Sequence, residues 1–291
     1  MKCNYSFPST LKNNSTLYRF NLRGNDTNLG FTLVELSIVL MIIGLLVSGI
    51  LVGQDMIRAA EMRSIITEKD EIQTAVTLFT NKYSELPGDL SNATDFWGTM
   101  PTGTCSNTVA GASGGTGTQT CNGNGDGMII SNTALNSNAN SEFVLFWQHL
   151  SNAKMIKGTY SGIWTNWADT KTYYSSKMMT AYWYVGNITA LTSDVIWFEG
   201  DYGNSLLHRG PADNIADASA DKSFVLTPME AWNIDKKIDD GLPGVGEVNI
   251  LERDGANCNT LAASATTPAA SYSYNLGYKG IACSLNFKNM F

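Results

Sequence analysis

The sequence predicts an α+β protein in which one long N-terminal helix precedes a head of shorter helices and strands. Residues Leu36 to Gln54 are uncharged, and the helical spacing of apolar residues continues beyond them until Pro87 stops it. All seven tryptophans follow that proline, together with strand-like runs bounded by glycine and asparagine. About 200 residues remain after the helix, which is enough for one domain with its own core.

The uncharged run is long enough for one membrane crossing. Laid out as a helix at about 1.5 Å per residue, Phe31 to Gly53 spans roughly 34 Å. Glu35 lies near the start of this span, and an unpaired carboxylate costs about 2.5–3.5 kcal/mol at a membrane centre. If the chain were cut between Gly30 and Phe31, the new α-amino group would lie within about one turn of a neighbouring copy's Glu35. The sequence therefore indicates two buried charges that neutralise each other only on assembly.

The residues around this cut carry a family resemblance. Gly30, followed by Phe31, Thr-Leu-Val, Glu35, Leu36 and a long apolar helix, resembles the class III signal of type IV pilins and type II secretion pseudopilins. In that family a prepilin peptidase cuts after the glycine and methylates the new N-terminus. The resemblance implies cleavage between Gly30 and Phe31, N-methylation of Phe31, and a role for Glu35 in setting the axial register of assembly. The alternative is an ordinary signal anchor with a chance glutamate, whereas a secretory signal would be cut after the apolar run.

Residues 1–30 are interpreted as a leader that the cleavage removes. The leader is net positive and should stay cytoplasmic by the positive-inside rule. Its length resembles the type IVb branch, whereas Phe31 resembles type IVa pilins and pseudopilins, so the subclass stays open. Without the leader's four basic residues and one acid, the chain keeps 15 of 19 basic and 25 of 26 acidic residues. This negative balance argues against a nucleic-acid partner.

After the leader, the predicted long helix divides into two segments. Residues 31–53 form the transmembrane or filament-core half, and residues 54–86 form an amphipathic half. In the second half, apolar residues at spacings of three and four predict a stripe that packs on the head, which comprises residues 87–291. The stripe consists of Met62, Ile65, Ile66, Ile72, Val76, Phe79 and Tyr83.

The head is predicted to contain two helices and several strands. One helix covers Glu142–Gly158 with Ser141 as its N-cap, and another covers Pro228–Lys237 with Thr227 as its N-cap. Long surface loops are expected at Thr102–Gly127 and Gly255–Asn275. Strands are expected at Thr180–Val185, Val195–Glu199, Ser205–His208 and Val245–Leu251. This order is similar to the pilin plan, which implies a stalk helix packed on an antiparallel sheet.

Cysteine usage indicates export to an oxidising compartment. Loss of Cys3 with the leader leaves an even set of four: Cys105, Cys121, Cys258 and Cys283. Three pairings are possible, and local pairing predicts Cys105–Cys121 and Cys258–Cys283. Closing loops of this size contributes roughly 3 kcal/mol each. No two of these four cysteines have the sequence spacing that is typical of metal ligands, which argues against a cysteine metal site.

Two stretches are candidates for calcium. Asn122, Asn124 and Asp126 place oxygen ligands at alternate residues before Gly127, as in the first half of an EF-hand loop, but a turn-forming loop explains them equally well. Asp235, Asp239 and Asp240 cluster at a predicted helix end, where like charges and the helix dipole repel them unless a cation or lysines relieve the strain. Calcium in a head loop is also found in some pseudopilins.

Catalysis is not expected from this sequence. The two histidines, His149 and His208, have no nucleophile motif beside them, and neither a nucleotide loop nor a metalloprotease pair is present. Both histidines are interpreted as packing or surface residues. The chain is therefore interpreted as a structural subunit and not as an enzyme.

The predicted function is that of a pilin or minor pilin in a type IV pilus-like filament. Two alternatives stay open: a pseudopilin of a type II secretion system, and a membrane-tethered carbohydrate-binding or adhesin module. The resemblance implies as partners other copies or other pilins, a prepilin peptidase, an assembly ATPase and an inner-membrane platform protein. The expected location is the bacterial inner membrane, with a cytoplasmic N-terminus, followed by a periplasmic or cell-surface filament.

Overall fold

The computed structural model confirms the α+β class. It describes residues 30–101, 105, 117–129, 142–163, 171–178, 180–188, 198, 200–211, 224–250, 257–261 and 269–291. The leader up to residue 29, Ser141 and all of the expected strand Val195–Glu199 except Phe198 lie outside the described residues. The chain divides into two compact units, one ending at Gly53 and one beginning at Gln54.

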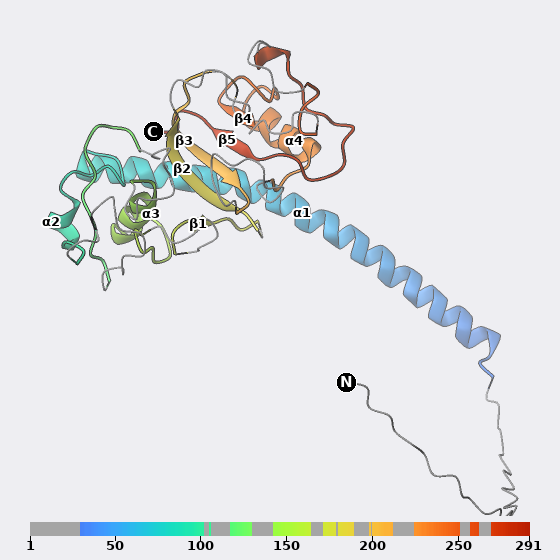
Figure 1. Cartoon of the computed structure of the whole chain (residues 1–291). Coiled ribbons are helices and arrows are strands. Elements are labelled where there is room, and N and C mark those ends of the chain that lie inside the picture. The colour runs from blue at the N-terminus through green and yellow to red at the C-terminus, as the bar shows by residue number, and fades with distance from the viewer. Residues whose placement is uncertain are drawn as a thin grey trace, which may run out of the picture. The chain divides into compact units, whose positions relative to one another are not determined.

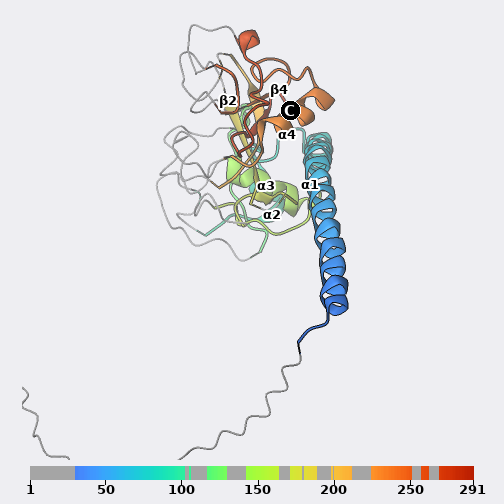
Figure 2. The ribbon, with the colours of Figure 1, turned by 90° about the vertical axis from the view of Figure 1, so that its right-hand side faces the viewer.

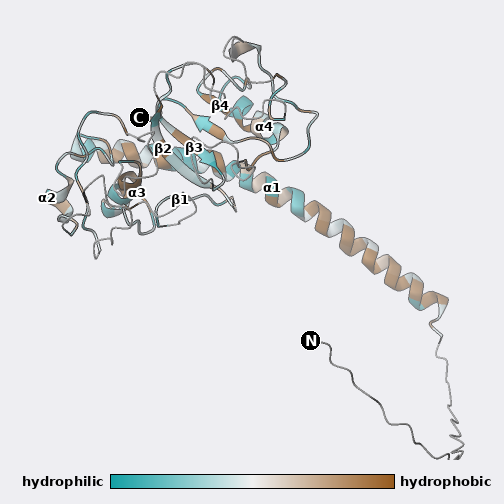
Figure 3. Cartoon of the chain, viewed as in Figure 1, coloured by the Kyte–Doolittle hydropathy of each residue, from teal (hydrophilic) through white to brown (hydrophobic). Residues whose placement is uncertain are grey.

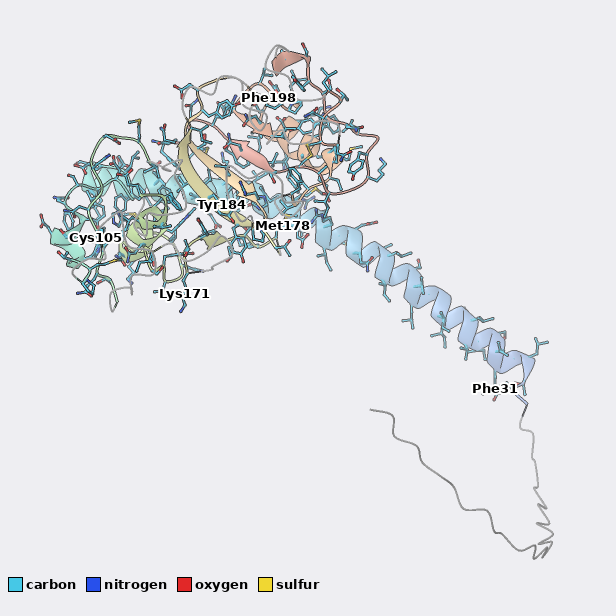
Figure 4. The ribbon with its side chains drawn as sticks, viewed as in Figure 1. Phe31, Cys105, Lys171, Met178, Tyr184 and Phe198 are labelled. Carbon is cyan, nitrogen blue, oxygen red and sulfur yellow. A yellow bond between two sulfur atoms is a disulfide. The ribbon has the colours of Figure 1, made fainter. Side chains whose placement is uncertain are left out.

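Helix α1 covers Leu33–Tyr83 and has 51 residues (Figure 1). It begins two residues after the predicted start and ends three residues before Leu86, because Ser84 adopts a positive φ of 66° that interrupts the helix ahead of Pro87. Among the described residues, α1 is the one helix long and apolar enough to cross a membrane, and its most apolar stretch has no buried residue. Figure 3 shows apolar residues around the first half of α1, and Figure 4 shows their side chains projecting outward from Phe31 onward.

The head contains a five-stranded antiparallel sheet in the order β1-β2-β3-β5-β4. Its strands are β1 Tyr174–Ser175, β2 Tyr182–Ile188, β3 Gly203–Arg209, β4 Val248–Ile250 and β5 Leu285–Phe287. The predicted strands 180–185 and 205–208 correspond to β2 and β3. The predicted strand 245–251 corresponds to β4, which is shorter than predicted. The sequence reading missed β1 and β5, which are too short to show an alternating pattern.

The second half of α1 runs along the head and passes one face of the sheet (Figures 1 and 2), and its buried residues lie between Ile65 and Phe79. The register places Trp183, His208 and Leu285 side by side on that face. Trp183 donates a hydrogen bond from Nε1 to Glu68 on α1, at 2.7 Å. The predicted apolar stripe is confirmed: Ile65, Ile72, Val76 and Phe79 are buried, and Met62, Ile66 and Tyr83 pack against the core at its edge.

Helix α3 covers Glu142–Asn152, which corrects the predicted end at Gly158. The amide of Met155 donates to the carbonyl of Leu150, and Lys154 has a positive φ of 63°, so the helix closes with a left-handed C-terminal turn. Every residue from Phe143 to Ser151 is buried. Such all-round burial leaves no solvent face, so this helix lies inside the core and not on its surface.

Three further helical elements complete the described head. Helix α2 covers Ala93–Trp97, and the 3-10 helix η1 covers Ala269–Ser271 inside the segment that was expected to be a loop. Helix α4 covers Pro228–Ile238 and confirms the predicted helix with Thr227 as its N-cap. Thr227 and Glu230 form a reciprocal capping box, in which each side chain binds the other residue's backbone amide.

Candidate functional site

The N-terminus of α1 is held by Thr32 and Glu35. The Thr32 amide and hydroxyl each donate to Glu35 Oε2 at 2.8 Å, and the Glu35 amide donates back to Thr32 Oγ1 at 3.2 Å. This reciprocal arrangement is a capping box, which satisfies amides that a helix start otherwise leaves unpaired. Sequence reasoning missed the contribution of Thr32, although Thr-x-x-Glu is itself the signature of such a box.

The capping box gives Glu35 a second role besides the predicted register. Both donors from Thr32 go to Oε2, and Oε1 accepts no hydrogen bond from the described residues. The side chain is exposed, as is every residue from Gly30 to Val52. One carboxylate oxygen therefore organises the helix start, while the other is open to an amine from another molecule.

The predicted cleavage site lies immediately before α1. Gly30 and Phe31 are outside the helix, and Phe31 is 84% exposed. A Cβ atom added at Gly30 would meet no atom of the described residues within 4 Å. The chain's own packing therefore imposes no need for glycine at position 30, which is consistent with a requirement set by an enzyme that reads this position.

The structure contains the two disulfides that the sequence favours. Cys105 bonds to Cys121 with a Cα–Cα distance of 5.5 Å, and Cys258 bonds to Cys283 with one of 5.3 Å. Cys283 also exchanges backbone hydrogen bonds with Leu226, just before α4. The second disulfide therefore holds the C-terminal loop to the residues that begin α4.

The C-terminal candidate metal residues are brought together. Asp235, Asp239 and Asp240 each have a carboxylate oxygen within 4.8 Å of the others. Asp235 is buried and accepts from the Gly241 amide at 3.1 Å and from the Tyr274 hydroxyl at 2.8 Å. Burial raises the pKa of Asp235 to about 7, and the negative charges of Asp240 and Asp239 add to the rise.

Asp239 and Asp240 also accept hydrogen bonds from backbone amides. Asp239 Oδ2 accepts from the amides of Glu247 and Val248, and Asp240 Oδ1 accepts from the Leu242 amide at 2.7 Å. The other oxygen of each of these two carboxylates accepts no hydrogen bond within the described part of the chain. Carboxylate oxygens of this kind suit calcium, so calcium at Asp235, Asp239 and Asp240 stays a prediction that the geometry allows.

The N-terminal candidate residues are arranged differently from the expectation. Asn122 Oδ1 accepts from the Thr94 amide in the first turn of α2, and Asn124 exchanges hydrogen bonds with Asp126 in a local turn, so both side-chain amides already have partners within the chain. The acids that converge here are Asp89, Asp126 and Glu142. Sequence reasoning missed Asp89 and Glu142, because they lie far from Asp126 along the chain.

Asp89 has a structural role that needs no metal. It is 1% exposed and accepts from the amides of Gly125 at 2.6 Å, Asp126 at 3.3 Å and Gly127 at 2.8 Å. Burial raises the pKa of Asp89, while the hydrogen bonds from Gly127 and Gly125 lower it in part. The Asn/Gly loop is therefore folded around this carboxylate, which favours the turn interpretation of residues 122–127.

Both histidines are buried packing residues. His149 Nδ1 accepts from the Gly88 amide at 2.9 Å, and its Nε2 lies 2.9 Å from the Thr120 hydroxyl. His208 Nε2 lies 3.0 Å from the Ser176 hydroxyl. Burial lowers the pKa of each to about 3, so both are neutral at physiological pH. Neither is exposed, so neither can meet a substrate from solvent.

The apolar, exposed start of α1 indicates a membrane-anchored protein, and a family model matches the sequence at this end of the chain. Residues 26–51 match the family model described as the prokaryotic N-terminal methylation motif. The chain thus carries the prepilin-type signature of type IV pilins and pseudopilins. No curated protein and no solved structure matches it. The motif supports a pilin-like or pseudopilin subunit, processed by a prepilin peptidase, and points to a structural role and not to an enzyme.

Proposed function

We propose that the chain is a structural subunit of a type IV pilus-like filament. Prepilin peptidase cuts between Gly30 and Phe31 and methylates the new N-terminus. Residues 31–53 hold the subunit in the inner membrane and then pack in the filament core, while the head forms the outer surface. The observation that carries this proposal is the methylation motif at the start of a helix whose apolar first half is exposed on all sides.

The charge at position 35 supports assembly through the N-terminus. In a membrane or filament core, the exposed carboxylate of Glu35 is costly unless a cation meets it. The α-amino group of Phe31 in a neighbouring copy supplies that cation after cleavage. Because Oε2 is used within its own chain, Oε1 is the oxygen that receives the neighbour's amine.

An assembly ATPase and an inner-membrane platform protein complete the proposed pathway. The exported part of the chain begins after Gly53, and its two disulfides are compatible with the oxidising periplasm. A pseudopilin of a type II secretion system is the second candidate, because the same motif serves both classes. The large head favours a surface-displayed pilus subunit over a compact secretion component.

The test has two parts. Mass spectrometry of the membrane-extracted chain should find Phe31 as the N-terminal residue, carrying one methyl group. Glu35→Ala and Glu35→Gln should both strongly reduce recovery of the chain in sheared filaments. Thr32→Val removes the cap hydroxyl but keeps the charge, and should assemble at near wild-type levels. A mature chain that keeps residues 1–30, or normal incorporation of Glu35→Gln, would contradict the proposal.

A further inference from the structure

Three exposed apolar side chains lie beside the junction between α1 and α4. Ile57 on α1, Met229 in the first turn of α4 and Ile281 in the C-terminal loop are 64%, 37% and 58% exposed. Single exposed apolar residues are ordinary, but several in one small region indicate a contact surface. We refer to Ile57, Met229 and Ile281 as the base patch.

The hydrogen bonds of the junction bring the base patch together. Arg58 on α1 donates to Glu230 on α4 at 2.8 Å and to the Val225 carbonyl at 3.0 Å. The next carbonyl along the chain, that of Leu226, accepts from the Ala282 amide at 2.9 Å. Each base-patch residue is adjacent in the chain to Arg58, Glu230 or Ala282. The three exposed side chains therefore belong to one small region of the head.

This junction begins shortly after the predicted end of the membrane span. Along α1, Arg58 follows Gly53 by about 8 Å. A bilayer is about 40–45 Å thick around a hydrocarbon core of about 30 Å, so each headgroup layer is about 5–8 Å deep. Residues 31–53, at roughly 34 Å, are long enough to fill the core. An upright helix therefore places Ile57 and Arg58 at the outer edge of the headgroup layer.

The C-terminal loop also carries residue types that favour a membrane interface. Tyr278, Lys279 and Ile281 are close together in the chain and all exposed. Tyrosine combines an apolar ring with a polar hydroxyl, and lysine extends its charge from an apolar stem, so both suit a headgroup layer. The Lys279 ammonium donates to the Leu276 carbonyl at 3.2 Å and makes no ion pair with another described residue. Its charge is therefore available to an anionic lipid.

We propose that the base patch lies in the headgroup layer of the inner membrane before the subunit is assembled. Ile57, Met229 and Ile281 bury their side chains among the lipid headgroups, and the Lys279 ammonium meets an anionic lipid phosphate. The bilayer is the occupant because α1 continues from the span into the junction as one helix, which brings lipid next to this surface. Assembly then has to lift the base patch off the membrane.

Lipids that carry a nitroxide on the headgroup test this contact by quenching fluorescence. The full chain is reconstituted in vesicles of phosphatidylethanolamine and phosphatidylglycerol, with Cys3→Ser to remove the free thiol. A fluorophore on Ile281→Cys should be quenched roughly two- to fourfold more than one on Leu78→Cys. Leu78 is the matched control, because it is similarly exposed and lies about 32 Å beyond Ile57 along α1. Equal quenching at the two positions would overturn the proposal.

A charge placed in the base patch provides the second measurement. Met229→Glu should lower the quenching at position 281 about twofold, because a carboxylate resists burial beside anionic headgroups. Met128→Glu, at a similarly exposed methionine after the Asn/Gly loop, is the matched control and should change the quenching little. Equal effects of the two substitutions would contradict a lipid contact by Met229.

A water-soluble quencher separates lipid from a second copy of the chain as the occupant. Iodide should reach the fluorophore at position 281 less than the one at position 78, because the headgroup layer shields it. Shielding from iodide without quenching by the nitroxide lipid would mean that a second copy covers the base patch. That outcome would also refute the proposal.

This inference rests on the membrane anchor of the proposed function, and a fluorophore inside the span separates the two. A label on Leu45→Cys should be quenched by lipids with a nitroxide on the acyl chain. If this label is quenched and the base patch is not, the headgroup contact fails and the proposed function stands. No quenching at position 45 would show that residues 31–53 do not enter the bilayer, and both would fail.

Discussion

Glu68 is a carboxylate inside the head core, at a position where the apolar stripe of α1 passes under the sheet. It is fully buried and accepts two hydrogen bonds, from the Lys177 amide at 2.8 Å and from Trp183 Nε1 at 2.7 Å. Buried polar groups are tolerated when they are fully paired, and Glu68 meets one donor with each oxygen. This residue therefore fixes where α1 sits against β2 and the turn after β1.

Glu68→Gln should lower the free energy of unfolding by about 1–3 kcal/mol, because the amide nitrogen of glutamine faces a donor that needs an acceptor. Chemical denaturation of the full chain in detergent, followed by tryptophan fluorescence, measures the change. Glu71→Gln is the matched control, because Glu71 is exposed and lies one turn further along α1. Equal midpoints for the two variants would show that Glu68 does not position the helix.

At the residue scale, Asp239 and Asp240 are predicted calcium ligands. We expect calcium at pH 8 to raise the free energy of unfolding by about 2–3 kcal/mol when its concentration is 100 times the dissociation constant. Asp239→Asn should remove this effect, and a chelator should remove it from the wild type. Asp126→Asn is the control for the other acidic group and should keep the full effect. Titration calorimetry that detects no calcium binding would end the prediction.

At the scale of elements, Arg58 joins α1 to α4. Its guanidinium donates to both carboxylate oxygens of Glu230, at 2.5 Å and 2.8 Å, and to the Val225 carbonyl at 3.0 Å. Glu230 also closes the capping box of α4 with Thr227. One carboxylate therefore both begins α4 and anchors it to α1, in a bidentate geometry that favours arginine over lysine.

Arg58→Ala should destabilise the head by about 1–3 kcal/mol, and Arg58→Lys should recover only part of that loss because lysine cannot make the fork. Arg63→Ala, on the same helix but without an ion pair in the described residues, should change stability by less than about 0.5 kcal/mol. A double-mutant cycle with Glu230→Gln measures the coupling. A coupling energy near zero would mean that α4 is held by its apolar contacts alone.

The elements also show what the sequence can and cannot predict. α1 and α4 were predictable because their signals are local: an apolar run, a proline, and a threonine three residues before a glutamate. The end of α3 was not, since the turn at Lys154 uses a residue with no evident preference for positive φ. Strand β5 has three residues and is defined by its neighbours β3 and β4. Asp89 joins the Asn/Gly loop only through tertiary contacts, which no sequence spacing reveals.

At the scale of the whole molecule, the free energy of unfolding depends on pH through three buried groups, and two of them act in the opposite direction to the third. His149 and His208 have folded pKa values of about 3, below the ordinary value, so they contribute stability above pH 6.5 that is lost as the pH falls. Asp235 has a raised folded pKa of about 7, so its contribution is present below the unfolded value near 4 and is lost as the pH rises through 7. We therefore expect a stability maximum near neutral pH.

Asp235→Asn should separate these contributions. Between about pH 4 and 7 the folded wild type keeps a proton on Asp235 that the unfolded chain has lost, which reduces the rise in stability with pH by up to about 1.4 kcal/mol per unit. The variant should therefore gain stability more steeply over this range, and at pH 8 it should exceed the wild type by roughly 1–3 kcal/mol. Denaturant midpoints from pH 5 to 8 in the presence of a chelator measure both curves, with Asp126→Asn as the exposed-carboxylate control. Parallel curves for Asp235→Asn and the wild type would mean that the Asp235 carboxylate is already ionised throughout this range, and that its burial beside Tyr274 carries no electrostatic cost.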